Sequence, residues 1–185
     1  MLQLNLYRKR NQNVSEEKGT DRLMLSVREM RENDWPEVCR IYRQGMETNL
    51  ATFEKEIPPY DVWNRNHLPS GRLVCEYENK TAGWTALTPF SSRRCFSGVA
   101  EVSIYISNGC KRMGVGTRLL FDLIEDAERN GIWMLQSQIM LNNEPSLALH
   151  RKCGFREVGY REKIAKDPRG NWRDMVLMEY RSSYV

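Results

Sequence analysis

The stretch from Ala100 to Thr117, AEVSIYISNGCKRMGVGT, decides the fold of this chain. Residues 100–106 are mostly apolar, with β-branched and aromatic side chains, and predict a strand. Residues 114–130 repeat apolar side chains at helical spacing and predict an amphipathic helix. Between the two, Gly114 and Gly116 allow a tight turn that gathers backbone N–H groups at the positive end of the helix dipole. Such a turn suits an anion such as a pyrophosphate.

Basic side chains strengthen this interpretation of the turn. Lys111, Arg112 and Arg118 lie within the turn or directly after it, where they would attract negative charge. The glycine pattern alone is a weak signal, so an ordinary strand-to-helix turn stays open as an alternative. The turn is not a P-loop, because no Gly-Lys-Ser/Thr follows at the required spacing. It is not a dinucleotide fingerprint either, because Leu119 stands where the third glycine would be.

The composition predicts one ordinary globular domain. The 185 residues include 41% hydrophobic and 28% charged side chains, which is enough for a hydrophobic core and unlike a disordered chain. We place a single α/β domain at residues 23–185. Residues 1–22 are polar and show no sustained period, which predicts a mobile N-terminal extension.

Charge and residue usage argue against several classes of protein. The 28 Lys and Arg outnumber the 24 Asp and Glu by too little, and too evenly along the chain, to predict nucleic-acid binding. No apolar stretch approaches the roughly 20 residues of a membrane helix, and the first residues lack the apolar core of a signal peptide. The five cysteines and two histidines do not cluster as zinc ligands, so we expect no metal. Reduced thiols in a cytoplasmic protein are the expected state of the cysteines.

Periodicity and turn residues place the remaining elements. An opening strand near Leu25 to Met30 precedes a helix that Asn33 would cap, with Pro36 in its first turn. The other predicted elements are a helix over 60–68, a hairpin of strands 72–77 and 81–87, a loop over 89–98, a strand over 134–140, a helix over 146–153, and closing strands over 155–160 and 175–180.

Two motifs carry a resemblance to a known family. Residues 111–116, KRMGVG, match the pattern Arg/Gln-x-x-Gly-x-Gly/Ala, except that Lys111 replaces the usual Arg or Gln. Residues 143–155, NEPSLALHRKCGF, match a second pattern downstream. Through both motifs the sequence resembles the GNAT family of N-acetyltransferases, in which the first motif binds the pyrophosphate of coenzyme A. The exchange at Lys111 matters little for this resemblance, because backbone amides are the main phosphate donors in that loop.

Within the GNAT family, the sequence is most similar to the phosphinothricin and methionine sulfone type of N-acetyltransferase. The segments that support this similarity occur in the same order as in that group: residues 51–54, 101–106, 146–155 and 172–174. The resemblance implies a mixed, mostly antiparallel central sheet that is splayed in the middle and flanked by helices. It also implies acetyl transfer from acetyl-CoA to the primary amine of a small, amino-acid-like acceptor, by direct attack of the amine on the thioester.

The resemblance also assigns residues to acetyl-CoA. The splayed strand would bind the pantetheine arm through its backbone, the glycine loop would bind the pyrophosphate, and an asparagine would contact the pantetheine arm. The residues at these positions are Ile104, Tyr105, Ile106, Lys111, Arg112, Met113, Gly114, Val115, Gly116, Thr117, Arg118 and Asn143.

Two residues are candidates for proton transfer. An alkyl ammonium at neutral pH must lose a proton before it can attack a thioester, so a base is needed nearby. Glu101, at the start of the best strand, matches the glutamate thought to take this proton in the group that the sequence resembles. A solvated carboxylate at a strand end is the alternative. His150 stands where many family members place a tyrosine suggested to protonate the departing thiolate, although a lone histidine on a short helix is more often structural.

The acceptor pocket is predicted less sharply. By resemblance, the segments 47–70 and 88–99 would close it, and Arg93 or Arg94 would hold an acceptor carboxylate. Loop arginines that simply face water are the alternative for these two. The residues expected to face the acceptor are Phe53, Glu54, Phe90, Arg93, Arg94, Phe96 and Trp172.

Two other functions stay open at this stage. A protein or peptide N-acetyltransferase would need an open groove, and a module that binds acyl-CoA without catalysis would not need Glu101. Dimers are common in the group that the sequence resembles, and the strand predicted over 175–180 would contribute to such an interface.

Overall fold

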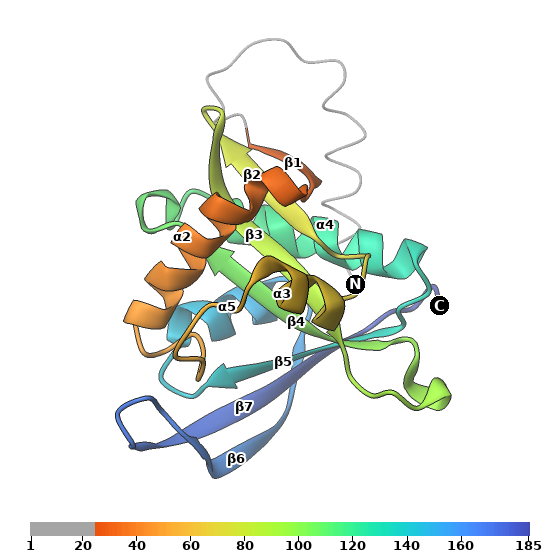
Figure 1. The fold of residues 1–185 in the computed structure, drawn as a ribbon. Helices are drawn as coiled ribbons and strands as arrows, with labels where there is room; N and C mark the ends of the chain where they lie inside the picture. Colours follow the sequence, from red (N-terminus) through yellow and green to blue (C-terminus); the bar gives the residue numbers. More distant parts are fainter. Residues whose placement is uncertain (1–24) are drawn as a thin grey trace.

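The fold is given by a computed structural model that describes residues 25–185 (Figure 1). The extension predicted over residues 1–22 lies outside this range. The strands are β1 Ser26–Glu29, β2 Leu73–Tyr77, β3 Lys80–Pro89, β4 Val99–Ile106, β5 Met134–Met140, β6 Arg156–Lys166 and β7 Trp172–Arg181. The α-helices are α2 Trp35–Glu47, α3 Tyr60–Asn66, α4 Val115–Arg129 and α5 Glu144–Lys152. Short 3-10 turns are η2 Glu32–Asp34, η3 Arg94–Phe96 and η4 Asn108–Cys110.

The seven strands form one open sheet in the order β1-β2-β3-β4-β5-β7-β6. Within residues 25–185, only the pair of β4 and β5 is parallel, and it spans three positions, from Val99 opposite Met134 to Glu101 opposite Gln136. Beyond Glu101 the two strands separate, while β3 stays paired with β4 as far as Ile106. The expectation of a mostly antiparallel sheet splayed in its middle is confirmed.

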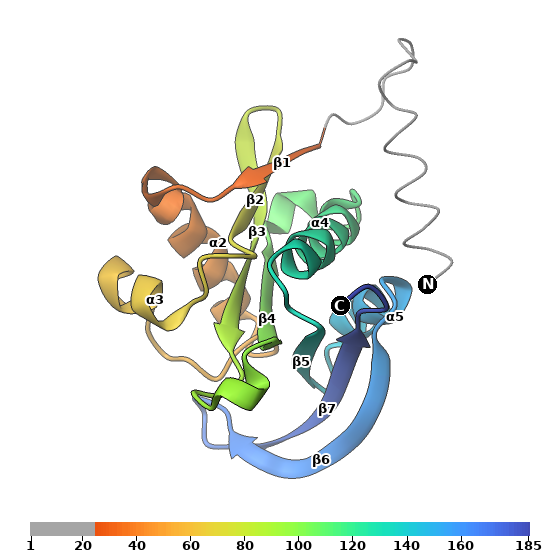
Figure 2. The same cartoon turned by 90° about the vertical axis from the view of Figure 1, so that its right-hand side faces the viewer.

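Helices cover both faces of the sheet (Figure 2). Helices α2 and α3 lie on one face, and α4 and α5 lie on the other. Strand β4 alternates between the two layers: Ala100, Val102 and Ile104 pack in the hydrophobic cluster beneath α4, whereas Tyr105 packs with the cluster beneath α2 and α3. Glu101 lies on the same face of the sheet as Tyr105, because every second side chain along a strand points to the same face. The alternation of side chains along β4 therefore places Glu101 on the face that α2 and α3 cover.

Two predicted elements differ from the structure. Asn33 does not cap the first helix, because a 3-10 turn precedes α2 and Asp34 takes the capping position. The Asp34 carboxylate accepts the backbone N–H of Arg31 at 2.7 Å, which closes this turn. Strands β6 and β7 extend well beyond the predicted ranges 155–160 and 175–180. The side chains of β6 are almost all exposed, so the strand shows no buried stripe from which its length could be read.

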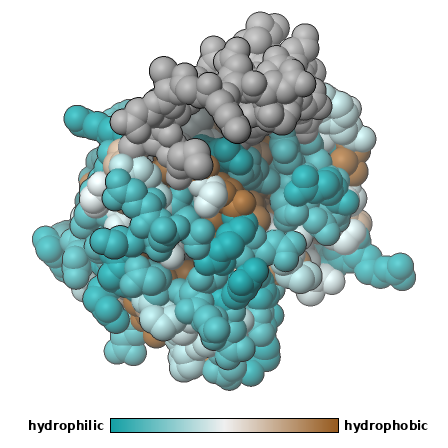
Figure 3. Space-filling model, turned by 90° about the horizontal axis from the view of Figure 1, so that it is seen from above, coloured by the Kyte–Doolittle hydropathy of each residue, from teal (hydrophilic) through white to brown (hydrophobic). Residues whose placement is uncertain are grey.

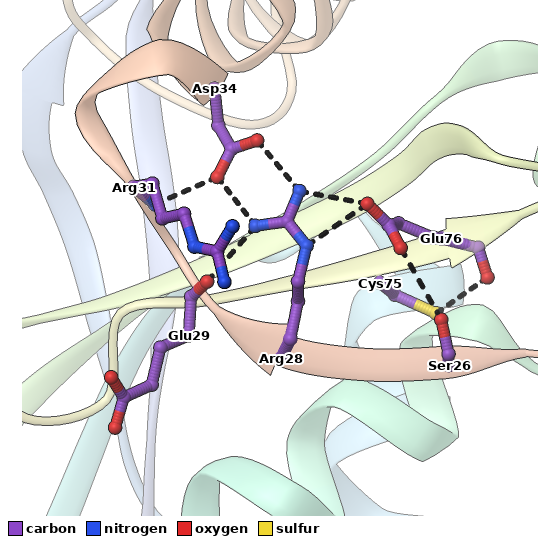
Figure 4. A network of polar contacts seen from close by, with 7 residues as sticks. All are labelled: Ser26, Arg28, Glu29, Arg31, Asp34, Cys75 and Glu76. Atoms are coloured by element: carbon purple, nitrogen blue, oxygen red, sulfur yellow. Dashed lines mark hydrogen bonds and ion pairs between the residues drawn. The ribbon is translucent and has the colours of Figure 1, made fainter.

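An ion cluster links strand β1 to the turn η2 and to strand β2 (Figure 4). Arg28 donates to the Asp34 carboxylate at 2.7 and 2.8 Å and to Glu76 of β2 at 2.7 and 3.0 Å. The hydrogen bonds from Arg28 hold the pKa of Asp34 below its usual value. The cluster thus fixes the start of α2 against the edge of the sheet.

The surface seen from above is mainly hydrophilic, with only small apolar areas among the coloured residues (Figure 3). Within residues 25–185, none of the helices combines the length and the apolar character that a bilayer span requires.

The ion cluster predicts a pH-dependent stability. Asp34→Asn removes the charge that Arg28 binds and is expected to lower the free energy of unfolding by about 1 kcal/mol at pH 7, as for a partly exposed pair. Because the folded-state pKa of Asp34 is lowered from 3.8, this stabilisation is present above that value and is lost as the pH falls through the lower folded pKa. Urea unfolding of both proteins from pH 7 to acid measures the difference. Glu32→Gln, in the same turn, serves as control, and a difference that persists in acid would contradict the assignment.

Candidate active site

Two cavities lie along the gap between β4 and β5. The larger cavity has a volume of about 870 Å³ and the smaller one about 580 Å³. They meet at a common wall, to which Ile104 and Tyr105 of β4 and the start of α5 contribute. The residues that line both cavities are Leu50, Ala51, Ile104, Tyr105, Asn143 and Ser146. The two cavities are therefore adjacent compartments of one site.

The smaller cavity is built for an anion. Its lining includes Lys111, Arg112 and Lys152 and no acidic residue among those described. Gly114 caps α4 with a φ of +86°, and a side chain at this position would meet open space. The first backbone bond of α4 runs from the N–H of Arg118 to the carbonyl of Gly114 at 3.0 Å. The preceding N–H groups of the helix are thus left without helical partners at the positive end of the helix dipole, where they can bind an anion.

The larger cavity has the opposite charge. Glu54, Glu56 and Glu101 line it, and neither Lys nor Arg occurs among its described lining residues. Aromatic side chains form much of the remaining wall. These are Tyr42, Phe53, Trp63, Trp84 and Tyr105.

Glu101 lies where β4 and β5 part. It forms the last parallel pair, opposite Gln136, and its half-buried carboxylate lines the larger cavity. Gln138 Nε2 donates to Glu101 Oε2 at 3.5 Å, and Gln138 Oε1 accepts from Arg161 Nη1 at 2.9 Å. Since the guanidinium can only donate, it fixes the amide of Gln138 with its NH₂ group toward Glu101. A carboxylate thus faces the cavity next to the wall that the two compartments share.

Tyr105 forms part of that shared wall. Its ring stacks on Trp84 with centroids 4.7 Å apart and lies 4.8 Å from the ring of Tyr42. Its hydroxyl donates to the carbonyl of Ala51 at 3.3 Å, and burial raises its pKa far above the usual value. Tyr105 is therefore neutral and fixed in position.

His150 is almost fully buried, with 1% of its surface exposed, and lines the larger cavity. Its Nδ1 lies 2.8 Å from the carbonyl of Ser146. Because a carbonyl only accepts, Nδ1 carries the hydrogen and Nε2 keeps a free lone pair. Nε2 is buried and has no partner within residues 25–185. Burial lowers the pKa of the imidazole to about 4, so His150 is neutral at pH 7.

A buried carboxylate joins two chain segments that line the larger cavity. Asp167, at the turn between β6 and β7, accepts from Asn49 Nδ2 and from Arg173 Nε, each at 2.9 Å. Burial alone would raise the pKa of Asp167, but these donors and Asn171 hold it below its usual value. Asn49 precedes residues 50–59, many of which line one side of the cavity, and Ile164 and Ala165 of β6 line the other. We call this contact the Asp167 clasp.

Comparison with known proteins identifies the family. The model of the acetyltransferase (GNAT) family matches residues 25–155, which is more than half of the chain. The chain belongs to the GNAT family.

Relatives with known names extend the comparison. The chain is 34% identical over 169 residues to the phosphinothricin N-acetyltransferase of Alcaligenes faecalis, covering 85% of this chain and 83% of that protein. It is 25% identical to an L-methionine sulfoximine/L-methionine sulfone acetyltransferase of Pseudomonas paraeruginosa, covering 85% and 94%. Among solved structures, the ribosomal-protein-alanine N-acetyltransferase of Brucella melitensis is similar, with 28% identity, a TM-score of 0.76 and coverage of 85% and 99%.

The protein is thus an acetyl-CoA-dependent N-acetyltransferase, as the two sequence motifs predicted. The features of the smaller cavity fit the donor: cationic side chains, unpartnered N–H groups at the start of α4 and open space at Gly114 suit a pyrophosphate. Within residues 25–185, no group of side chains is arranged to hold a metal ion.

Most of the residues expected to bind acetyl-CoA lie together. Of the predicted set, Met113 and Arg118 are the two that do not line the smaller cavity. Met113 packs against the core beneath α4, and Arg118 forms an ion pair with Asp122 one turn along the helix. The remaining members are Ile104, Tyr105, Ile106, Lys111, Arg112, Gly114, Val115, Gly116, Thr117 and Asn143.

The residues expected to bind the acceptor are divided. Phe53 and Glu54 line the larger cavity. Arg93, Arg94 and Phe96 lie in and beside the short turn η3 and line neither cavity. Phe90 is 46% exposed and packs against Phe96, while Trp172 is 55% exposed beneath Lys166 at 4.8 Å. The segment 88–99 therefore contributes only Thr88 to the lining, and the predicted arginine clamp is not brought to the cavity.

Several lining residues escaped the sequence reasoning. Ser137 and Gln138 of β5 and Thr52 face the larger cavity, and Lys152 of α5 faces the smaller one. Polar residues interrupt the strand sequence MLQSQIM (134–140), and this interruption could have indicated that Ser137 and Gln138 line a site. No local pattern distinguishes Lys152 from other basic residues at the end of a helix.

The anion loop makes a first prediction about the site. Gly114→Asp places a negative charge in the space for the pyrophosphate and should abolish the rise in melting temperature that acetyl-CoA causes in the wild type. Gly170→Asp is the matched control, because Gly170 also has a positive φ, of +85°, and open space around it, but lies in the turn between β6 and β7. Unchanged acetyl-CoA affinity in a folded Gly114→Asp protein would remove the assignment.

The environment of His150 makes a second prediction. Its imidazole should stay neutral from pH 8 to pH 5, with the hydrogen on Nδ1, because burial lowers its pKa to about 4. Nitrogen NMR shifts of the two imidazoles, assigned with His67→Asn, measure this directly. A neutral ring whose N–H is bound to a carbonyl has no proton for a thiolate, so the structure does not favour the acid role expected for His150. A titration of His150 near pH 6.5 would restore that role.

Proposed function

We propose that this protein acetylates the primary amine of a small, amino-acid-like molecule, with Glu101 as the base. The observation that carries the proposal is the position of Glu101, at the mouth of the gap between β4 and β5 and inside a cavity that adjoins the anion site. The names of the phosphinothricin and methionine sulfoximine relatives support an acceptor of this size.

The residues divide the work between holding the donor and preparing the amine. When bound, acetyl-CoA supplies the activated acetyl group as a thioester. The anion loop, residues 111–117, would hold its phosphates, and Asn143 and the backbone of residues 104–106 would hold its pantetheine arm. Those backbone groups are available because β4 has parted from β5 after Glu101. Glu101 would take a proton from the acceptor ammonium and leave a neutral amine for attack.

A protein acceptor is the second candidate. The similarity to a ribosomal-protein-alanine N-acetyltransferase favours it. The Asp167 clasp joins two chain segments that line the larger cavity, residues 50–59 and the pair Ile164 and Ala165, and this bounded wall favours a small molecule instead. Product analysis with amino acids and with alanine-terminated peptides separates the two.

We further propose that the protein is a cytoplasmic homodimer without a nucleic-acid partner. All five cysteines are free thiols, which supports a reducing compartment. The strand over 175–180 is not free to pair, because β7 lies between β5 and β6. The strand β6 forms the sheet edge and exposes Val158, Tyr160 and Ile164, which supports pairing there instead. Sedimentation equilibrium tests this, and a monomer at every concentration contradicts it.

The role of Glu101 predicts a specific kinetic defect. Glu101→Gln keeps the shape and removes the base, so kcat should fall about 10²- to 10⁴-fold at pH 7. Acetyl-CoA affinity should stay within a few-fold, since this carboxylate does not line the smaller cavity. The defect should shrink as the pH rises toward the pKa of the amine, where the neutral nucleophile forms without help.

Steady-state kinetics across pH, with acetyl-CoA binding measured separately, make the test. Glu47→Gln, at the exposed end of α2, is the matched control, because Glu47 lines neither cavity. A Glu101→Gln enzyme with near-normal kcat at pH 7 would assign the proton transfer to water or another residue.

A further inference from the structure

The two cavities of the site differ in the sign of their charge. The smaller cavity has the cations Lys111, Arg112 and Lys152 in its lining, which matches the polyanionic donor. The larger cavity has three carboxylates, Glu54, Glu56 and Glu101, and within residues 25–185 no Lys or Arg lines it. One carboxylate is sufficient for the proton transfer proposed for Glu101. Glu54 and Glu56 are therefore left without a role in the chemistry.

The carboxylate of Glu54 acts on the interior of the cavity. Burial raises the pKa of Tyr42 and of Tyr105, and the negative charge of Glu54 raises both further. Both tyrosines line the larger cavity, and Tyr105 belongs to the wall shared with the smaller one. Glu54 and Glu56 are both exposed to solvent, so their charges act on an acceptor in the cavity through partly screened interactions.

The basic residues around the larger cavity have other partners. Arg173 binds the buried carboxylate of Asp167 at 2.7 Å, and Arg161 donates to Gln138. Arg93 and Arg94 lie in and beside the turn η3, away from the lining. An anionic group on the acceptor would therefore meet carboxylates without a cation from residues 25–185 to balance them.

Both histidines in the lining are neutral. Burial lowers the pKa of His67 and of His150, and each places its Nδ1 against a backbone carbonyl, that of Trp63 or Ser146. The buried Nε2 of His150 offers a lone pair for which residues 25–185 provide no donor. This independent feature calls for an N–H group from a ligand. Trp84 Nε1 is also buried without a partner, but as a neutral donor it cannot balance an anion.

The aromatic wall also suits a cation. Rings of Tyr42, Phe53, Trp63, Trp84 and Tyr105 line the same cavity as the carboxylates. Aromatic faces attract ammonium groups through the negative charge density of the ring face, more strongly where water is excluded. A cavity with carboxylates, aromatic rings and an unpartnered lone pair matches an ammonium group better than a carboxylate or phosphinate.

We propose that the acceptor carries a second ammonium group, so that among acceptors of equal length and backbone a cationic tail is preferred to a neutral or an anionic one. The inference rests on the proposed function and narrows its acceptor class. Glu101 receives the proton of the amine that reacts, while Glu54 and Glu56 bind the ammonium that does not. Residues 50–59, which line much of the larger cavity, thus select the charge of the acceptor through Glu54 and Glu56.

Two matched series of acceptors test the inference with the intact enzyme and saturating acetyl-CoA. The first is cadaverine, pentylamine and 5-aminopentanoate, and the second is lysine, norleucine and 2-aminoadipate. In each series kcat/KM should be highest for the cationic tail, lower for the neutral tail and lowest for the anionic tail. The ratio of kcat/KM between the cationic and the anionic acceptor should be at least about tenfold, and added salt should reduce this ratio. The second series also shows whether an α-carboxylate is tolerated. An anionic tail that is used as well as a cationic one overturns the inference.

Variants separate charge from shape. The double variant Glu54→Gln/Glu56→Gln should reduce the ratio of kcat/KM between cationic and anionic acceptors to about threefold or less. It removes both charges, while Glu101 still supplies the base. Glu47→Gln should leave this ratio as in the wild type, since it removes an exposed carboxylate outside both cavities. A ratio that the double variant leaves unchanged also overturns the inference.

A binding measurement distinguishes this inference from the proposed function. Calorimetry of the six acceptors with the coenzyme A-bound enzyme ranks their affinities without any turnover. The absence of acetylation with every amine contradicts the proposed function. The same order of affinities, cationic above anionic, would still support the charge preference of the cavity, and the reverse order would contradict it.

Discussion

The parting of β4 from β5 is the feature on which the rest of this structure depends. Three parallel pairs, ending at Glu101 and Gln136, hold the strands together, and beyond them no strand among residues 25–185 pairs with β4 on that side. An unpaired backbone inside a protein costs free energy unless another group binds it. The backbone of residues 102–106 is therefore free on this side to bind a ligand. Both cavities lie along this one interruption of the sheet.

The shared wall explains how two cavities of opposite charge can adjoin. The residues common to both are Leu50, Ala51, Ile104, Tyr105, Asn143 and Ser146, and none of them carries a charge at neutral pH. Cations gather at the start of α4, and carboxylates gather on β4 and on the segment after α2. Distance and a neutral partition thus prevent the two sets from pairing with each other and cancelling the fields that the ligands require.

The parts of the site predicted from sequence are those in which function follows local pattern. The sequence predicts the strand β4, the glycine turn and the apolar face of α4, because hydrophobic period and turn chemistry act over a few residues. The role of Glu101 was predicted from the resemblance to a known group of enzymes. The position of Arg93 and Arg94 cannot be predicted from the local sequence. Their loop ends at Gly98, where a Cβ would come within 2.0 Å of the Trp133 ring, so a distant residue decides its path.

The same limit applies to the surroundings of Glu101. The contact of Gln138 with Arg161 depends on the register of β5, β7 and β6, which are brought together only by the fold. The register shift between Arg161 and Ala165 adds a further change that the exposed sequence of β6 does not reveal. Contacts across three strands are tertiary facts, and no window along the chain contains them.

The Asp167 clasp has an evolutionary consequence. Residues 50–59 and the pair Ile164 and Ala165 line the larger cavity, and they are joined to each other through Asn49 and Asp167 rather than through the central strands. Residues 52–59, 164 and 165 do not line the smaller cavity, so substitutions there leave the anion loop and the parallel pairs untouched. A lineage can therefore exchange the acceptor that its enzyme recognises while the donor site and the proton acceptor are inherited intact, so that new acetylation specificities arise from drift in two short surface segments.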